Sequence, residues 1–220
     1  MKKIVYTALM GLLALTACTV DSYDKGDGKY SLMQAELVDL NVNAQKAATS
    51  FVTDEGDRYQ LTPPITTSWF QTADTTYRAI LYFNALPDAT AEAVSLGVVP
   101  TLRATEHWKL EKQPEDPIGM ESAWLSRTGK YINLGLLIKT GQVGGEDGTH
   151  TVALAQDTIL VNADQTRTAH FRFLHDQSGV PEHYTNRRYV SILLPDTIQL
   201  DTIRLTIPTY EGKIERTFLP

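Results

Sequence analysis

The residue best suited to a chemical modification is Cys18, the only cysteine among the 220 residues. It follows Leu-Thr-Ala at positions 15–17, an uncharged and mostly apolar run at positions 4–14, and a positively charged start. This order is typical of a lipoprotein signal peptide, and the apolar run is too short to span a bilayer as a permanent helix. We therefore predict that residues 1–17 are removed and that Cys18 is lipidated. Because each buried methylene contributes about 0.8 kcal/mol, two or three acyl chains would hold the protein permanently in a membrane.

Histidines are the next candidates, as metal ligands. His170 and His175 are five positions apart, so on one straight strand they would point to opposite faces of the sheet. One of them could join His183 and Asp176 around a metal ion. The Asp, Ser and Gly residues within positions 175–179 favour a solvated turn instead. We predict no metal site and no cofactor.

Motifs of the common catalytic sites are missing from the sequence. We find no Gly-x-Ser-x-Gly elbow, no Ser-x-x-Lys pair, no His-Glu-x-x-His helix and no glycine loop for phosphate. Lipidation of Cys18 would also leave no thiol for a nucleophile, a disulfide or a metal ligand. We predict no catalytic residues, with an unrecognised hydrolase as a less favoured alternative.

A repeated Asp-Thr pattern offers a possible modification site. It resembles the Asp-Ser/Thr-apolar acceptor that is used for O-glycosylation of exported proteins in one phylum of anaerobic Gram-negative bacteria. The alternative is that Asp ends a turn and Thr-Ile opens a strand. The threonines concerned are Thr158, Thr197 and Thr202, with Thr75 in a looser match.

The tryptophans could serve either binding or packing. An exposed strip of Trp69-Phe70, Trp108 and Trp124 would suit a sugar ligand. Aromatic side chains in a β-protein of this size more often fill a core or an interface between domains. We expect packing, with Trp108 and Trp124 between two domains.

Charge argues against nucleic acid as a partner. The chain has a formal net charge of −6, and cleavage would remove two lysines but no acidic residue. Phosphate binding needs clustered Lys and Arg, which the sequence lacks. The polar, Asp- and Gly-rich residues 18–29 indicate a flexible tether after Cys18. Asp21, Asp24 and Asp27 are spaced three apart and not two, so they do not match an EF-hand calcium loop.

From residue 30 the apolar residues alternate with period two. One long strand is expected at 33–42 with a bulge near Leu37-Val38, where the alternation slips by one position. A hairpin follows at 48–61, then a central strand at 76–86, and then a strand at 95–106 in which Pro100 marks an edge or a bulge.

A linker without apolar pattern separates two halves. Residues 113–118 contain two prolines and two acids, so we place the domain boundary there, between residues 30–112 and 119–220. The second half has short alternating strands, a glycine-rich segment at 141–148 that indicates a flexible loop, and no convincing helical period. The pattern predicts an all-β chain that ends in an antiparallel β-sandwich.

Several segments together resemble the NigD-like lipoproteins. They are DSYDKGDGKYS at 21–31, TGKYINLGLLIK at 128–139 and HDQSGVPEHYT at 175–185, and they follow the lipoprotein signal in the order found in that family. The resemblance implies an N-terminal OB-like five-stranded barrel and a C-terminal β-sandwich. It brings no catalytic residues with it.

Three functions remain open from the sequence. The favoured one is a membrane-anchored module of the cell envelope, held at the periplasmic or cell-surface face of the outer membrane through Cys18, that binds a protein or a glycan without catalysis. OB folds do bind oligosaccharides across one face, but fold alone does not establish function. A bacteriocin-associated, immunity-like role is the alternative that the family name suggests. A hydrolase is the third.

Overall fold

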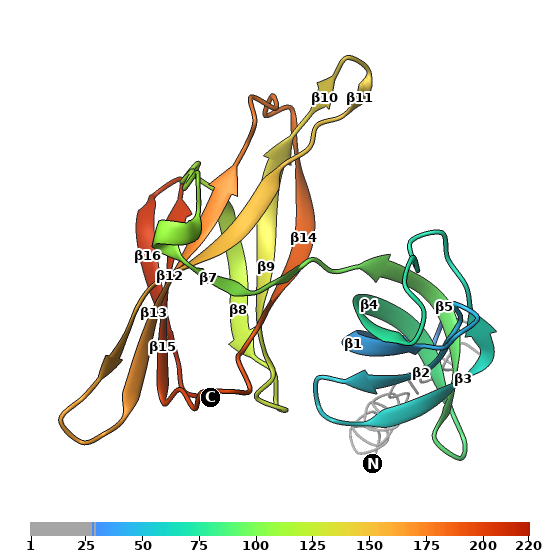
Figure 1. Ribbon diagram of the computed structural model, residues 1–220. Helices are drawn as coiled ribbons and strands as arrows, with labels where there is room; N and C mark the ends of the chain where they lie inside the picture. The colour runs from blue at the N-terminus through green and yellow to red at the C-terminus, as the bar shows by residue number, and fades with distance from the viewer. Residues whose placement is uncertain (1–27, 29) are drawn as a thin grey trace, which may run out of the picture. The chain divides into compact units, whose positions relative to one another are not determined.

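The computed structural model describes residue 28 and residues 30–220, and almost all of these residues belong to strands or to the turns between them (Figure 1). The predicted lipidation site Cys18 and most of the predicted tether at 18–29 lie outside the described residues. Within the described residues, no helix is long and apolar enough to span a membrane. The predicted all-β class is confirmed.

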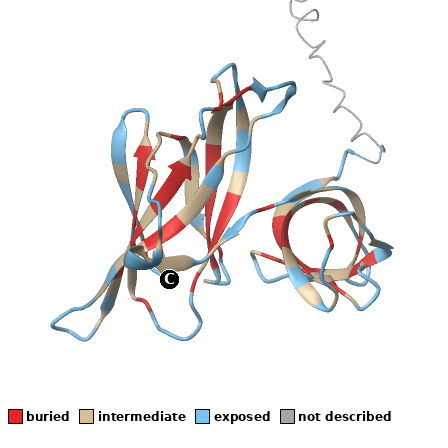
Figure 2. Ribbon diagram, turned by 45° about the horizontal axis from the view of Figure 1, so that its top comes forward, coloured by how far each residue is buried: buried red, intermediate tan, exposed pale blue. Residues whose placement is uncertain are grey.

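A closed five-stranded barrel forms from the first strands. They are β1 (Gln34–Val42), β2 (Ala48–Thr53), β3 (Arg58–Ile65), β4 (Thr75–Leu86) and β5 (Thr90–Val98). The order around the barrel is β1-β2-β3-β5-β4, and only the β3–β5 pair is parallel. Figure 2 looks along the barrel and shows buried segments on the inside of the ring. The predicted OB-like barrel is confirmed, as is the hairpin of β2 and β3.

The bulge predicted near Leu37-Val38 is wrong. β1 pairs with β4 without a shift in register from Gln34 to Val42, and its register against β2 shifts only at Asn41/Val42. The apolar alternation slips by one position in the sequence because both faces of β1 are covered. Val38, Leu40 and Val42 fill the barrel, whereas Leu37 and Asp39 point outward and are still only 7 % and 9 % exposed.

The strand predicted at 95–106 is broken at Pro100. β5 ends at Val98, and then β6 (Thr101–Leu102) and β7 (Ala104–Glu106) join two different sheets, beside β14 and β12 respectively. By strand pairing, the change from the barrel to the following sheets therefore comes between Val98 and Thr101. A division into separately folding domains at 113–118 stays a prediction.

Two facing sheets make up most of the rest of the described chain. Their longer strands are β8 (Gly119–Leu125), β9 (Tyr131–Thr140), β12 (Thr151–Val161), β13 (Arg167–Asp176), β14 (Tyr184–Leu193), β15 (Thr202–Thr209) and β16 (Gly212–Phe218). The sheet orders are β16-β15-β13-β12-β7 and β6-β14-β9-β8. Most pairs are antiparallel, but β13–β15, β12–β7 and β14–β6 are parallel.

The shorter elements correct one further expectation. The glycine-rich segment at 141–148, expected to be a flexible loop, forms a small hairpin of β10 (Gln142–Val143) and β11 (Glu146–Asp147). A single 3₁₀ turn, η1 (His107–Lys109), follows β7.

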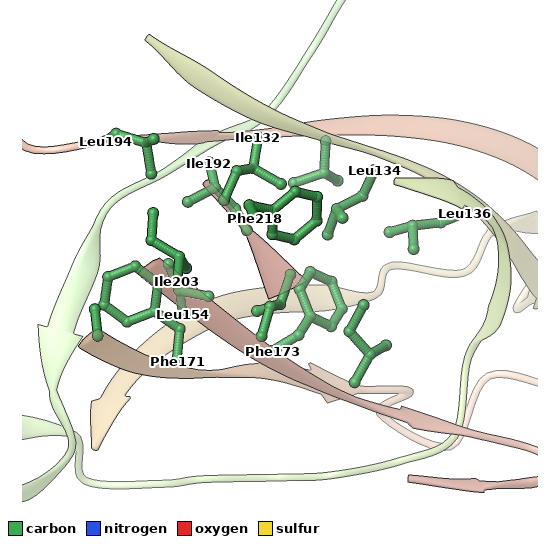
Figure 3. Packing of buried hydrophobic residues seen from close by; sticks show 14 of the residues in the cluster. Ile132, Leu134, Leu136, Leu154, Phe171, Phe173, Ile192, Leu194, Ile203 and Phe218 are labelled. Carbon is green, nitrogen blue, oxygen red and sulfur yellow. The ribbon is translucent and has the colours of Figure 1, made fainter. Parts of the chain in front are cut away.

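The sandwich has its own apolar core. Figure 3 shows Phe171, Phe173 and Phe218 among aliphatic side chains of both sheets. Ile118, at the end of the predicted linker, is 1 % exposed and belongs to this core, so the linker is fastened to the sandwich. Burial of one such side chain contributes about 1.5–3 kcal/mol. The barrel and the sandwich thus hold separate cores, and polar groups connect them.

Candidate functional site

A buried arginine joins the barrel to the sandwich. Arg78 lies on β4 with its side chain 3 % exposed. Its guanidinium donates to both carboxylate oxygens of Asp54 at 2.7 Å and to Oδ1 of Asn133 at 3.1 Å. Nε donates to Oγ of Ser191 at 3.0 Å. Asp54 belongs to the barrel, whereas Asn133 and Ser191 lie on β9 and β14 of the sandwich.

A second carboxylate completes this cluster. Asp39 on β1 accepts from Arg78 at 3.4 Å, from Nζ of Lys130 at 2.5 Å and from the hydroxyl of Tyr131 at 3.0 Å. The Arg78 guanidinium also lies 4.0 Å from the centre of the Tyr131 ring. We call Asp39, Asp54, Arg78, Lys130, Tyr131, Asn133 and Ser191 the Arg78 network. Two acids and two bases balance within it, which is the condition under which buried charges are tolerated.

Burial and the charge of Asp39 shift the pKa values of two groups in the network, Tyr131 and Lys130. Burial, followed by the negative charge of Asp39, raises the pKa of the Tyr131 hydroxyl. For Lys130, burial acts against the charged form, but the hydrogen bond and the charge of Asp39 outweigh it and raise the pKa of the amine. Both groups therefore stay protonated near neutral pH, and the network has a structural role.

A cleft of about 740 Å³ opens beside this junction, and we call it the junction cleft. Its walls come from β4, β5 and the connection after β5 on one side, and from β9, β12 and β14 on the other. The lining residues are Ile80, Tyr82, Gly97, Val98, Val99, Pro100, Ile138, His150, Val152, Arg187, Arg188, Tyr189 and Val190. Most are apolar, two are arginines and none is acidic. This combination of an apolar wall and a few polar groups, at this size, is typical of ligand sites.

His150, which lines the junction cleft, contacts a second histidine. Nδ1 of His150 lies 2.9 Å from Nε2 of His175, and Nδ1 of His175 lies 3.1 Å from the carbonyl oxygen of Asp116. A carbonyl only accepts, so Nδ1 of His175 donates to it, and Nε2 of neutral His175 accepts from His150. Nε2 of His150 is then left as an acceptor, and no described residue pairs with it.

This pair corrects the predicted solvated turn at 175–179. His175 ends up 1 % exposed near the end of β13, and the turn begins only after Asp176. The partner of His175 is His150, which was not among the predicted candidates, and neither His170 nor His183 joins them. In the described part of the chain, no three His, Cys, Asp or Glu residues gather as a metal would require.

Acid should weaken the fold through His150. Burial and the neighbouring His175 lower the pKa of His150 below its ordinary value of 6.5. The unfolded chain therefore takes up a proton before the folded chain does, and stability should fall as the pH drops below about 6.5. Between pH 7.5 and pH 5.5, the free energy of unfolding measured with urea should fall less in His150→Gln than in the unchanged chain. His183→Gln, at an exposed position, is the control and should keep the original pH dependence. If the free energy of unfolding changed equally with pH in all three proteins, His150 would not be the group responsible.

The threonines of the Asp-Thr pattern lie in different settings. Thr197 is exposed in the loop after β14, and Thr202 opens β15 after Asp201, as the turn-to-strand alternative expected. Thr158 instead lies inside β12, exposed next to a bulge, while Thr75 is the first residue of β4. Glycosylation of these residues stays a prediction, and Thr197 is the one that is exposed in a loop.

The structure confirms the packing role predicted for Trp69 and Phe70 but not the interdomain role predicted for Trp108. Phe70 is 2 % exposed in the barrel core, with Trp69 packed against that core, as expected. The interdomain role predicted for Trp108 is wrong, because its ring is 66 % exposed on η1, next to His107. Trp124 is 37 % exposed on β8 and packs edge-on against Tyr189 in the same sheet.

Comparisons with known proteins point to one family. A family model described as the NigD-like C-terminal beta sandwich domain matches residues 97–219, which include β6 and β7. No curated protein matches the chain.

Solved structures share the whole architecture. A NigD-like immunity protein from Bacteroides caccae is 22 % identical, with a TM-score of 0.65 over 85 % of this chain and 97 % of that one. A protein of Parabacteroides distasonis, described as a candidate toxin-related protein, is 17 % identical with a TM-score of 0.63, over 84 % and 92 % of the two chains. A candidate lipoprotein of Bacteroides fragilis is 12 % identical with a TM-score of 0.57, over 84 % and 96 %. At these identities the likeness establishes the fold.

Proposed function

Because the chain belongs to the family of the NigD-like C-terminal beta sandwich domain, we propose that it is a non-catalytic binding protein of the cell envelope whose ligand enters the junction cleft. The observation that carries this proposal is the cleft itself, with its apolar walls and two arginines. A similar fold is described as an immunity protein, and immunity by capture of a toxin requires binding and no chemistry. The lipid anchor on Cys18 at the outer membrane belongs to the same proposal, and one structural neighbour is described as a candidate lipoprotein.

The junction cleft is favoured over the other large hollow of the described chain. That hollow, of about 760 Å³, is lined by Asp74 and Asp196 as well as by Arg78, Arg103 and Lys130. Acids and bases are mixed there, and Arg78 and Lys130 already pair with the carboxylates of the Arg78 network. In the junction cleft the fixed charges are all positive, although the whole chain is negative. Such a local reversal of sign selects for a ligand with negative charge.

Charge reversal at Arg188 tests this function. A tagged chain recovered from membranes of its native host should carry a partner that Arg188→Glu loses, by about tenfold or more, because the reversed charge repels an anionic ligand. Arg216→Glu reverses an exposed arginine on β16, away from the cleft, and should keep the partner. Equal recovery with both variants would contradict the proposal, as would the absence of any partner with the unchanged chain.

A further inference from the structure

One edge of β14 is open beside the junction cleft. β14 pairs with β9 along its whole length, from Tyr184 to Leu193, but with β6 only at Ser191 and Ile192. Among the described residues, no strand pairs with the β6 side of β14 between Tyr184 and Val190. An open edge of this kind can accept a strand from another chain.

The backbone groups on this edge can be identified from Ser191. Its N–H donates to the carbonyl of Pro100 at 3.0 Å, so the N–H of Ser191 points to the side on which β6 lies. Backbone groups of a strand alternate between its two edges, and β14 has no shift in register against β9. The N–H and C=O groups of Thr185, Arg187 and Tyr189 therefore also face the open edge.

The junction cleft follows this edge and does not lie over one face of the sheet. Four successive residues of β14, at 187–190, line it, and successive side chains of a strand point to opposite faces. A cavity that all four line must run along the edge between the faces. The odd-numbered face is directed to the barrel, since Ser191 contacts Arg78, and the even-numbered face belongs to the sandwich, since Val190 lies in its core.

The charges beside the edge are not neutralised equally. Arg187 pairs with Glu121 on β8 at 2.5 Å. Arg188 is exposed, and no hydrogen bond or ion pair engages its guanidinium within the described part of the chain. Ile80 and Val98 of the barrel provide apolar contacts on the odd-numbered side of the cleft.

We propose that the ligand of the junction cleft is an extended acidic peptide that adds as a strand to the open edge of β14, in line with β6. This inference rests on the proposed function and names the chemistry of its ligand. Thr185, Arg187 and Tyr189 supply backbone hydrogen bonds, which give affinity without regard to sequence. Side chains of the added strand alternate, with acidic ones beside Arg188 and apolar ones toward Ile80 and Val98.

Amide exchange measured by NMR distinguishes strand addition from other binding. The probe is a capped peptide of alternating glutamate and valine, seven residues long, added to the full chain. At saturation the amides of Arg187 and Tyr189 should exchange at least tenfold more slowly. The amide of Arg188, which faces β9, serves as the internal control and should not change. A peptide with lysine in place of glutamate should bind at least tenfold more weakly, and Arg188→Glu should weaken the glutamate peptide to a similar degree.

Each other outcome overturns the inference. Shifts of cleft residues without slower exchange at Arg187 and Tyr189 would show that a peptide binds there without joining the sheet, and the proposed function would stand. Equal binding of the glutamate and lysine peptides would contradict the proposal that the ligand is acidic. Failure of the glutamate peptide to bind would remove the inference as a whole, while recovery of a partner that depends on Arg188 would still support the proposed function.

Discussion

Replacing Arg78 by alanine is expected to lower the free energy of unfolding by about 3–5 kcal/mol, because it leaves the largely buried carboxylate of Asp54 without its counterion and takes one of two cations from Asp39, which keeps Lys130. The side chains of Asp39 and Asp54 are only 12 % and 14 % exposed, so both carboxylates are largely withdrawn from bulk water. The measurement is urea unfolding at neutral pH.

Arg127→Ala provides the matched control for this result. Arg127 pairs with Glu55 at 2.9 Å, but both side chains are more than half exposed. Exposed pairs contribute at most about 1 kcal/mol, so this variant should unfold nearly as the unchanged chain does. If Arg78→Ala and Arg127→Ala lost similar amounts of stability, the Arg78 network would not hold the barrel to the sandwich as described.

Phe51→Ala is expected to cost about 3–5 kcal/mol, because it opens a cavity in the barrel core. Phe51 is fully buried and contacts the rings of Tyr59 and Phe83, with ring centres 5.1 Å and 4.9 Å away. Denaturant unfolding followed by the fluorescence of Trp69, which packs against this core, measures the loss.

The control for Phe51→Ala is a large apolar side chain outside the core. Leu219 is 71 % exposed, and Leu219→Ala should change the free energy of unfolding by no more than about 0.5 kcal/mol. A loss below about 1 kcal/mol in Phe51→Ala would mean that the barrel core is much looser than its ring contacts indicate.

Much of the fold could be predicted from the sequence because period-two patterns are local. The β2–β3 hairpin and most sandwich strands follow from alternating apolar residues and turn formers, and β4 follows from a run that is apolar on both faces. The predicted bulge in β1 failed because the pattern alone cannot show that a second layer covers the outer face of the same strand. The predicted strand at 95–106 failed for a related reason, since β6 and β7 pair with strands that come about fifty or more residues later.

Most of the candidate site could not be predicted from the sequence. The junction cleft needs β4, β5, β12 and β14 together, and the His150–His175 contact joins residues 25 positions apart. One signal was present all the same. Arg78 and Asp39 are charged residues within otherwise apolar strands, and charge at a buried position requires a partner. The pairing of β1 with β4 places these two residues opposite each other, which the sequence alone did not reveal.

Photocross-linking from both walls of the junction cleft tests the central claim most directly. A photoreactive phenylalanine derivative placed at Tyr82, on the barrel side, or at Tyr189, on the sandwich side, should capture the same partner in the native host. The same derivative at Trp108, which is exposed on η1, should not capture it. Mass spectrometry should then assign both cross-links to one short segment of the partner. Capture of that partner from Trp108 as efficiently as from Tyr82 and Tyr189, or capture from neither wall, would contradict the junction cleft as the binding site.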